Sequence, residues 1–255
     1  MPKSKVFASF AEAVRDIPDG AVIGFGGFAV VGMPVNLYEA LAGQGAKKLT
    51  CVSNSTRAGA TLPSDAPDMG WLIKNDQVKK VVCSFTAPTR ASQKLIFSEY
   101  YEKGLIEAEL VPQGTLAERL RAAGAGIPAF YTPAAVGTEL AEGRETRVFQ
   151  DREYLLEEAL PLDYAFIRAW QADEAGNLRF RRSQRNFNPL MAMAARVTVV
   201  EVEAPILPRG AIDPDDVHLP GIYVQRMAVI PPPPEGWWPL PPAEVARREA
   251  EKARR

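Results

Sequence analysis

Three short segments of the sequence carry residue types that can bind an anion or stabilise a developing negative charge. The first is the glycine-containing run 26–32, the second centres on Asn54, and the third begins with Gln113 and Gly114. Glycines let the backbone approach a ligand closely and leave amide N–H groups free to face negative charge. Side-chain amides can join such N–H groups in an oxyanion hole. The three segments are therefore candidates for one such site.

Each segment also has a purely structural explanation, which stays open at this point. Glycines after a strand often only form a tight turn, and Asn or Gln at a strand end often caps one. The glycine run does not match the dinucleotide-binding pattern G-x-G-x-x-G, because Ala29 stands at the last glycine position counted from Gly24. It does not match the Walker A pattern either. A functional role for the three segments is favoured only if one sheet brings them together.

A scarcity of histidine narrows the possible chemistry. His218 is the one histidine in 255 residues, and Cys51 and Cys83 are the two cysteines. A zinc site built on histidine pairs or on many cysteines is therefore excluded, and we expect no metal site. A Ser-His-Asp triad could use only His218, which no nucleophile elbow accompanies, so we interpret it as a loop or strand-edge residue. The chemistry should use carboxylates, amides and backbone groups.

The elements that must position these segments alternate between strands and helices. Capping-box spacing marks two helix starts, Ser9 with Glu12 and Thr115 with Glu118. The alternation predicts an α/β fold, a Rossmann-like, open, mostly parallel sheet with helices on both faces. The predicted strands span 21–25, 49–53, 80–85, 108–111, 164–169 and 197–202. The predicted helices span 9–16, the turns after Pro34, 91–103, 116–123 and 189–195.

In such a sheet, ligands bind beyond the carboxyl ends of the strands. Gly26 follows the first predicted strand, Asn54 follows the second, and Gln113 follows the strand at 108–111. Gln113 also stands at a helix start, where the helix dipole adds positive potential. The fold therefore predicts that all three segments lie at one edge of the sheet.

The amino-acid composition limits the possible domain organisation and the kinds of binding partner. Hydrophobic residues make up 47% of the chain, enough for a sizeable core in a domain over residues 1–230, whereas 231–255 form a proline-rich tail with a short polar helix. The 30 Lys and Arg residues balance 31 Asp and Glu residues, so neither nucleic acid nor a membrane is expected as a partner. We predict no signal peptide and no membrane span. Both cysteines fall in apolar runs, so we expect buried thiols and a cytoplasmic location.

One composite signature reads Asp19-Gly20, Gly26-Gly27-Phe28, Gly32 and Pro34. Five further blocks follow it in the sequence: 110–119, 124–132, 176–178, Arg185-Asn-Phe-Asn-Pro189 and 220–226. Taken together, these motifs resemble the alpha subunit of family I coenzyme A transferases over about residues 5–230. This family includes the succinyl-CoA:acetoacetate (3-oxoacid), 3-oxoadipate and acetate/acetoacetate CoA-transferases. The chain departs from common family residues at Val35 and Ser55.

The resemblance implies an active site that is shared with a second chain. The catalytic glutamate of the family belongs to the beta subunit, in a Ser-Glu-Asn-Gly type motif that this sequence lacks, so no catalytic residue is expected in this chain. Activity is expected only with the beta subunit, in a complex of two alpha and two beta subunits. Asn54, Gln113 and Gly114 match the family's substrate and oxyanion positions. The CoA-associated segment comprises Gly26, Gly27, Phe28, Ala29, Val30, Val31 and Gly32.

The implied reaction moves CoA from a donor acyl-CoA, expected to be succinyl-CoA, to a 3-oxoacid such as acetoacetate or 3-oxoadipate. It passes through a glutamyl-CoA thioester on the beta subunit, so CoA is a substrate and no tightly bound cofactor is implied. The alternatives are one chain of an acetate- or butyrate-type transferase, a catalytically inactive regulatory relative, and a sugar-phosphate isomerase-like enzyme. The isomerase would need acid and base groups in this chain, for which Glu39, Glu118 and Asp163 are candidates by residue type.

Overall fold

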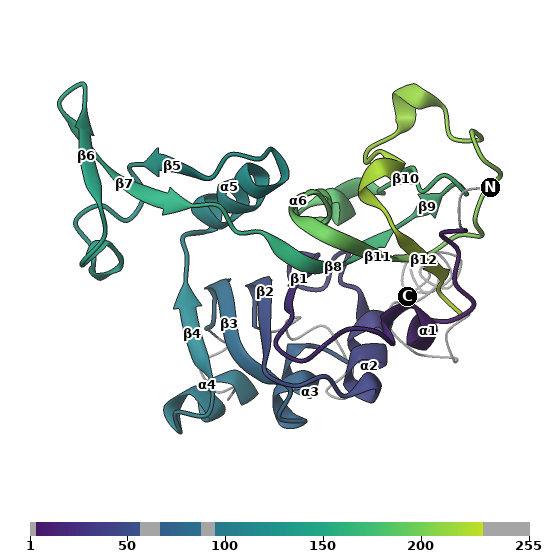
Figure 1. Ribbon diagram of the computed structural model, residues 1–255, viewed down its shortest axis with the longest axis horizontal. Coiled ribbons are helices and arrows are strands. Elements are labelled where there is room, and N and C mark those ends of the chain that lie inside the picture. Colours follow the sequence, from purple (N-terminus) through teal and green to yellow (C-terminus); the bar gives the residue numbers. More distant parts are fainter. Residues whose placement is uncertain (1–3, 57–66, 88–94, 232–255) are drawn as a thin grey trace, which may run out of the picture.

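The computed structural model describes residues 4–56, 67–87 and 95–231 and is built around a seven-stranded sheet (Figure 1). Neighbouring strands all run parallel, in the order β12-β11-β8-β1-β2-β3-β4. The predicted α/β fold is confirmed, and each predicted strand boundary lies within two residues of the observed one. The strands are β1 (Val22–Phe25), β2 (Leu49–Ser55), β3 (Val78–Phe85), β4 (Glu107–Leu110), β8 (Leu162–Ala169), β11 (Ala195–Val202) and β12 (Arg226–Val229).

Helices cover both faces of the sheet, as predicted, and each face has its own apolar core. One core contains Phe25, Leu41 and Leu72, and the other contains Leu116 and Met191. One face carries α1 (Phe10–Val14), α2 (Val35–Gln44), α3 (Met69–Lys74) and α4 (Ile96–Glu102), and the other carries α5 (Gln113–Gly124) and α6 (Asn188–Ala194) (Figure 1).

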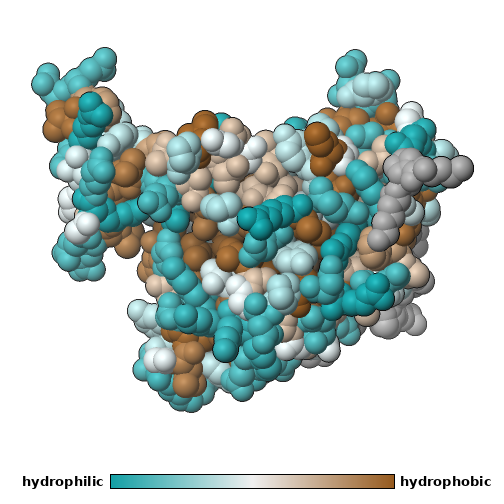
Figure 2. Space-filling view, viewed as in Figure 1, coloured by the Kyte–Doolittle hydropathy of each residue, from teal (hydrophilic) through white to brown (hydrophobic). Residues whose placement is uncertain are grey.

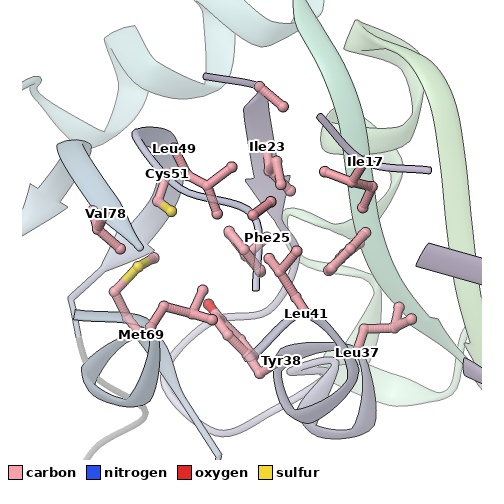
Figure 3. Close-up of a cluster of buried hydrophobic side chains, with 14 of the residues drawn as sticks. Ile17, Ile23, Phe25, Leu37, Tyr38, Leu41, Leu49, Cys51, Met69 and Val78 are labelled. Carbon is pink, nitrogen blue, oxygen red and sulfur yellow. The ribbon is translucent and has the colours of Figure 1, made fainter. Parts of the chain in front are cut away.

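The first core fixes the two ends of the segment that joins β1 to α2. Phe25, the last residue of β1, stacks on Tyr38 of α2 with ring centroids 4.3 Å apart, and it meets Phe166 of β8 edge-on at 5.5 Å. Figure 3 shows Phe25 and Tyr38 side by side in this core. All three rings are buried, so the exit of β1 and the start of α2 are held in place by packing.

Two helix starts test the predicted capping boxes. At α1, Ser9 Oγ accepts a hydrogen bond from the Glu12 N–H at 3.1 Å, and the Glu12 carboxylate accepts one from the Ala8 N–H at 3.2 Å, so this start is confirmed. The box at Thr115 is wrong, because α5 already begins at Gln113 and Thr115 lies in its first turn. The predicted helix 116–123 is correspondingly too short at both ends, because α5 extends from Gln113 to Gly124.

A small antiparallel sheet projects from the body, and the sequence does not predict it. It consists of β5 (Ala129–Thr132), β6 (Thr146–Phe149) and β7 (Arg152–Glu158), in the order β5-β7-β6, and it extends away from the main sheet beyond α5 (Figures 1 and 2). All four residues of β6 are exposed and no residue of β5 is fully buried. Strands exposed on both sides lack the continuous apolar runs on which the strand predictions depend.

Two short strands, β9 (Gln171–Ala172) and β10 (Leu178–Arg179), form a hairpin between β8 and α6. The start of the predicted helix 91–103 and the tail from residue 232 onward lie outside the described residues, so the predicted polar helix at the end of the chain stays a prediction. Within the described ranges, no helix is long and apolar enough to cross a membrane.

Candidate functional site

The segment between β1 and α2 leaves the carboxyl edge of the main sheet as a defined turn, here called the glycine loop (residues 26–32). The Gly26 N–H donates to the Phe166 carbonyl at 2.8 Å, which extends the pairing of β1 with β8 by one residue. Phe28 and Val31 exchange two backbone hydrogen bonds, of 3.0 and 3.1 Å, around the two residues between them. Their side chains stay 47% and 41% exposed. The glycine loop therefore presents two apolar side chains at the surface.

The backbone of the glycine loop also presents N–H groups. Gly27 and Gly32 have φ angles of 105° and 72°, a region that glycine adopts without steric cost. Ala29 has φ of 50°, which is uncommon for a residue with a side chain. The N–H groups of Gly27, Ala29 and Val30 make no hydrogen bond to any residue in the described ranges. They are therefore able to face a negatively charged group, as the glycine content predicts.

Two asparagines from the segment that leads into α6 clamp the glycine loop. Asn188 is fully buried, and its Nδ2 donates to the Gly32 carbonyl at 3.1 Å while its Oδ1 accepts the Arg168 N–H at 3.0 Å. The Nδ2 of Asn186 donates to the Val31 carbonyl at 2.9 Å. The two hydrogen bonds hold the last two residues of the glycine loop, Val31 and Gly32, against the segment that leads into α6.

A buried ionic network supports this clamp. Arg168 donates to Glu201 at 3.2 Å and to Glu203 at 2.8 Å. The other carboxylate oxygen of Glu201 accepts the N–H groups of Asn36 at 2.9 Å and Leu37 at 3.3 Å, in the first turn of α2. N–H groups at a helix start have no partner within the helix, and a carboxylate there is favourable. Glu201 thus ties β11 to the helix that follows the glycine loop.

Glu201 makes the stability of the chain depend on pH. Burial raises the pKa of Glu201 to about 7, although the Arg168 guanidinium and the Asn36 hydrogen bonds act in the opposite direction. Between about pH 4.5 and 7 the folded chain binds a proton at Glu201 that the unfolded chain has released. The resulting stability is fully present below about pH 4.5 and is lost as the pH rises through about 7, a change of about 3 kcal/mol. We expect Glu201→Gln to flatten this profile.

Urea unfolding of the wild-type and Glu201→Gln chains between about pH 5 and 8 measures the effect. His218 contributes with the opposite sign, because burial, Arg185 and Arg179 lower its pKa, but it is common to both chains. The difference in unfolding free energy between the two chains therefore isolates Glu201. A difference that stays constant with pH would contradict the assignment.

The two predicted amides meet at the carboxyl edge of the sheet. Gln113 Nε2, at the start of α5, donates to Asn54 Oδ1, near the end of β2, at 2.6 Å. Asn54 is 6% exposed, and its own NH2 group has no acceptor among the described residues. The geometry therefore differs from two independent donors: Gln113 orients Asn54, and Asn54 keeps a donor for a ligand.

Two buried hydroxyls lie around this amide pair. The register pairs Ser53 with Cys83, which places Ser84 beside Asn54 on the face that α5 covers. The hydroxyls of Ser84 and Thr115 are buried, and neither has a hydrogen-bond partner within the described part of the chain. Buried hydroxyls are ordinarily hydrogen-bonded. The amide pair therefore lies in a polar cluster that has donors and acceptors left for a bound molecule.

A small cavity joins the amide pair to the glycine loop. Its volume is about 20 Å³, which accommodates a water molecule but not an acyl group. Asn54, which Gln113 holds, is one of its lining residues, so the cavity and the amide pair adjoin each other at the carboxyl edge of the sheet. The lining residues include Gly26, Gly27 and Ala29 of the loop, Ser53, Asn54 and Ser55 of β2, and Met33, Tyr38 and Asp68.

Gly114, the two cysteines and His218 lie outside the lining of this cavity. Gly114 follows Gln113 in the first turn of α5, with open space where a Cβ would stand, and it does not line the cavity. Burial raises the pKa of both thiols, that of Cys83 to about 11, so neither is prepared to act as a thiolate. His218 Nδ1 accepts the Phe180 N–H at 2.9 Å, which confirms its structural role.

The three acids that an isomerase would use are not brought together. Asp163 accepts the Val22 N–H at 2.9 Å, at the amino end of β1 and thus at the edge opposite the glycine loop. Glu118 forms an ion pair with Arg121 at 2.6 Å on α5, and Glu39 is exposed on α2. The structure gathers the amides and glycines of the predicted site and leaves these acids apart.

Asn186 and Asn188 are the functional residues to which the sequence assigns no role. They lie in the block 185–189, which supports the family resemblance, but no spacing rule connects Asn188 to a loop 156 residues earlier. One local signal exists, since Pro189 favours a helix start at this point. An amide at a helix start that faces the carboxyl edge is a candidate for holding a neighbouring loop.

Comparison with known proteins agrees with this geometry. The family model for coenzyme A transferase matches residues 7–229. The chain is 45% identical over 225 residues to the A subunit of the probable succinyl-CoA:3-ketoacid coenzyme A transferase of Bacillus subtilis (strain 168), a match that covers 88% of this chain and 90% of that one. It is 44% identical over 227 residues to the A subunit of the 3-oxoadipate CoA-transferase of Pseudomonas putida, a match that covers 89% and 94%.

Among solved structures, the acyl-CoA transferase YdiF of E. coli O157:H7, in its thioester complex with CoA, matches with a TM-score of 0.74 and 23% identity. The match covers 92% of this chain and 49% of YdiF, so this chain spans about half the length of that protein. At this identity the likeness establishes the fold, and the two sequence matches to A subunits establish the relationship. The chain belongs to the coenzyme A transferase family.

Proposed function

We propose that this chain is the alpha subunit of a two-chain CoA-transferase that moves CoA from succinyl-CoA to a 3-oxoacid, with acetoacetate and 3-oxoadipate as the candidate acceptors. The relatives from Bacillus subtilis and Pseudomonas putida are both named as the A subunits of such transferases. The observation that carries the proposal is the hydrogen bond from Gln113 to Asn54 beside the glycine loop. This hydrogen bond orients the NH2 group of Asn54, a neutral donor that can bind the carbonyl oxygen of a thioester. CoA is a substrate in this proposal, and no bound cofactor is required.

The reaction is a covalent exchange on a glutamate of the beta subunit. The glutamate carboxylate attacks the carbonyl carbon of the donor thioester, and the C–S bond breaks to give an acyl-glutamyl anhydride and CoA thiolate. The thiolate attacks the glutamyl carbonyl, which releases the donor acid and leaves a glutamyl-CoA thioester. The acceptor carboxylate reverses these two steps. No net proton or electron is consumed.

The residues of this chain stabilise the oxyanion that forms in each attack. The NH2 group of Asn54 donates to the thioester oxygen, and Gln113 keeps that group in orientation. Gly27 and Ala29 line the same cavity as Asn54, and their N–H groups, which have no acceptor among the described residues, add donors. Donors that are fixed before the reaction stabilise the charge without rearranging. Because these donors are neutral, they do not pair with the attacking carboxylate as a cation would.

The second chain completes the site. A cavity of about 20 Å³ holds no acyl group by itself, and the exposed side chains of Phe28 and Val31 flank it. We expect the beta subunit to cover these residues through a large apolar interface, in a complex of two alpha and two beta subunits. Buried free thiols at Cys51 and Cys83 suit a cytoplasmic enzyme.

Reconstitution tests the proposal. The purified chain alone should transfer no CoA between succinyl-CoA and acetoacetate or 3-oxoadipate, and mixing it with a beta subunit should restore transfer. The two chains should elute together from a sizing column at micromolar concentration. Equal turnover by this chain alone would contradict the proposal, and so would a reconstituted complex in which acyl-CoA loss does not depend on an acceptor acid.

A further inference from the structure

A cluster of arginines lies beside the glycine loop and has no part in the oxyanion chemistry. Arg181, Arg182 and Arg185 lie in the turn between β10 and α6, and all three are exposed. None of the three forms an ion pair with any residue in the described ranges. The residue after them, Asn186, donates to the Val31 carbonyl of the loop at 2.9 Å. Three guanidinium groups that have no carboxylate partner among the described residues therefore belong to the turn that contacts the glycine loop.

Arg185 and Arg179 lie close enough to His218 to act on its charge. Burial is the largest cause that lowers the pKa of His218, and the positive charges of Arg185 and Arg179 act in the same direction. Asp216 acts in the opposite direction, but it is the carboxylate that pairs with Arg179, at 3.2 Å. Asp216 is thus already paired with Arg179, and Arg185 has no carboxylate partner among the described residues.

The geometry of the cluster suits phosphate groups. The Arg181 guanidinium lies over the Trp170 ring, 6.0 Å from its centroid, so the indole supports one face of the cation. A guanidinium presents a planar fork of N–H donors that matches the oxygens of a phosphate. CoA carries a diphosphate and a 3′-phosphate, and a phosphate monoester alone has a charge of about −1.5 to −2 at neutral pH.

We propose that Arg181, Arg182 and Arg185 bind the phosphate groups of CoA while its pantetheine arm runs along the glycine loop. The proposal rests on the proposed function and extends it by assigning the nucleotide end of the substrate. The exposed side chains of Phe28 and Val31 supply an apolar surface for the arm. The thioester at the far end of the arm then reaches the cavity that the loop lines.

The test compares two substrates in the reconstituted alpha–beta complex: succinyl-CoA and the succinyl thioester of pantetheine, which lacks the phosphates. Arg182→Gln and Arg185→Gln, singly and together, should raise KM for succinyl-CoA roughly 10- to 100-fold, the loss expected for charge-assisted hydrogen bonds. KM for the pantetheine thioester and kcat for both substrates should stay near wild type. Arg185→Lys, which keeps the charge but not the fork, should give an intermediate KM.

Arg196→Gln is the matched control, because Arg196 is exposed at the amino end of β11 and thus at the opposite edge of the sheet. It should change neither KM. An equal rise of KM for both thioesters in the Arg182 and Arg185 variants, or no rise for either, would overturn the proposal. Dissociation of the variant complex would also overturn it and would assign the arginines to the interface between the two chains. A wild-type complex without transfer activity would instead contradict the proposed function.

Discussion

Replacing Gln113 by alanine should lower kcat of the assembled complex roughly 100- to 1,000-fold and leave the melting temperature and the assembly of the complex nearly unchanged. The reason is the 2.6 Å hydrogen bond by which Gln113 holds Asn54 at the cavity. The thioester oxygen gains negative charge during attack, and an Asn54 amide that is free to rotate no longer meets it. Asn54→Ala removes the donor itself and should lower kcat at least as much.

The double variant separates an indirect role of Gln113 from a direct one. If Gln113 acts through Asn54, combining Gln113→Ala with Asn54→Ala should lower kcat little beyond Asn54→Ala alone. Asn75→Ala is the control, because Asn75 also makes an amide–amide hydrogen bond, to Gln77 at 3.3 Å, but ahead of β3 at the amino edge. Near wild-type turnover by a folded Gln113→Ala complex would remove the site assignment. A joint loss of activity, assembly and stability would make the amides structural.

Gly26→Ala should abolish detectable transfer and destabilise the chain by about 1–3 kcal/mol. A Cβ at Gly26 would stand 2.0 Å from Oδ1 and 3.3 Å from Cα of Asn188. Asn188 is fully buried and is hydrogen-bonded to Gly32 and Arg168, so it can move away only by releasing the glycine loop. A displacement of about 1 Å at a reacting centre is enough to lower a rate about 100-fold.

Gly43→Ala provides the matched control for this variant. Gly43 lies within α2, and a Cβ there would meet nothing within 4 Å. Alanine should therefore raise stability by about 0.5–1 kcal/mol without changing kcat/KM. Urea unfolding and steady-state kinetics of both variants measure the contrast. Wild-type kinetics in a Gly26→Ala complex would show that the asparagine clamp does not set the conformation of the loop.

Six of the seven strands of the main sheet could be predicted, because the inner strands are buried on both faces and leave continuous apolar runs in the sequence, whereas the short edge strand β12 is not predicted. Val81, Val82 and Cys83 are all buried in β3, for example, although they face alternate sides. Carboxyl ends of parallel strands share an edge, so Asn54 and Gln113 could be placed together although they are 59 residues apart. The strands of the projecting β5-β7-β6 sheet lack such apolar runs, so the same pattern does not predict them.

The details of the site could not be predicted, because they depend on side-chain packing between distant segments. Spacing places Gln113 and Asn54 at one edge but does not show that one amide holds the other. The contact of Asn188 with Gly32 joins residues 156 positions apart and requires the turn before α6 to have formed. The capping box at Thr115 fails for a local reason, since the helix begins directly after Pro112.

The mass of each chain after incubation of the alpha–beta complex with succinyl-CoA, in the absence of an acceptor acid, tests the proposed mechanism most directly. We predict that the beta chain gains the mass of CoA less one water, in a form that hydroxylamine removes as expected of a thioester, and that this chain keeps its own mass. The Gln113→Ala complex should form the adduct more slowly. CoA attached to this chain, or a complex that turns over without any adduct on the beta chain, would contradict the mechanism.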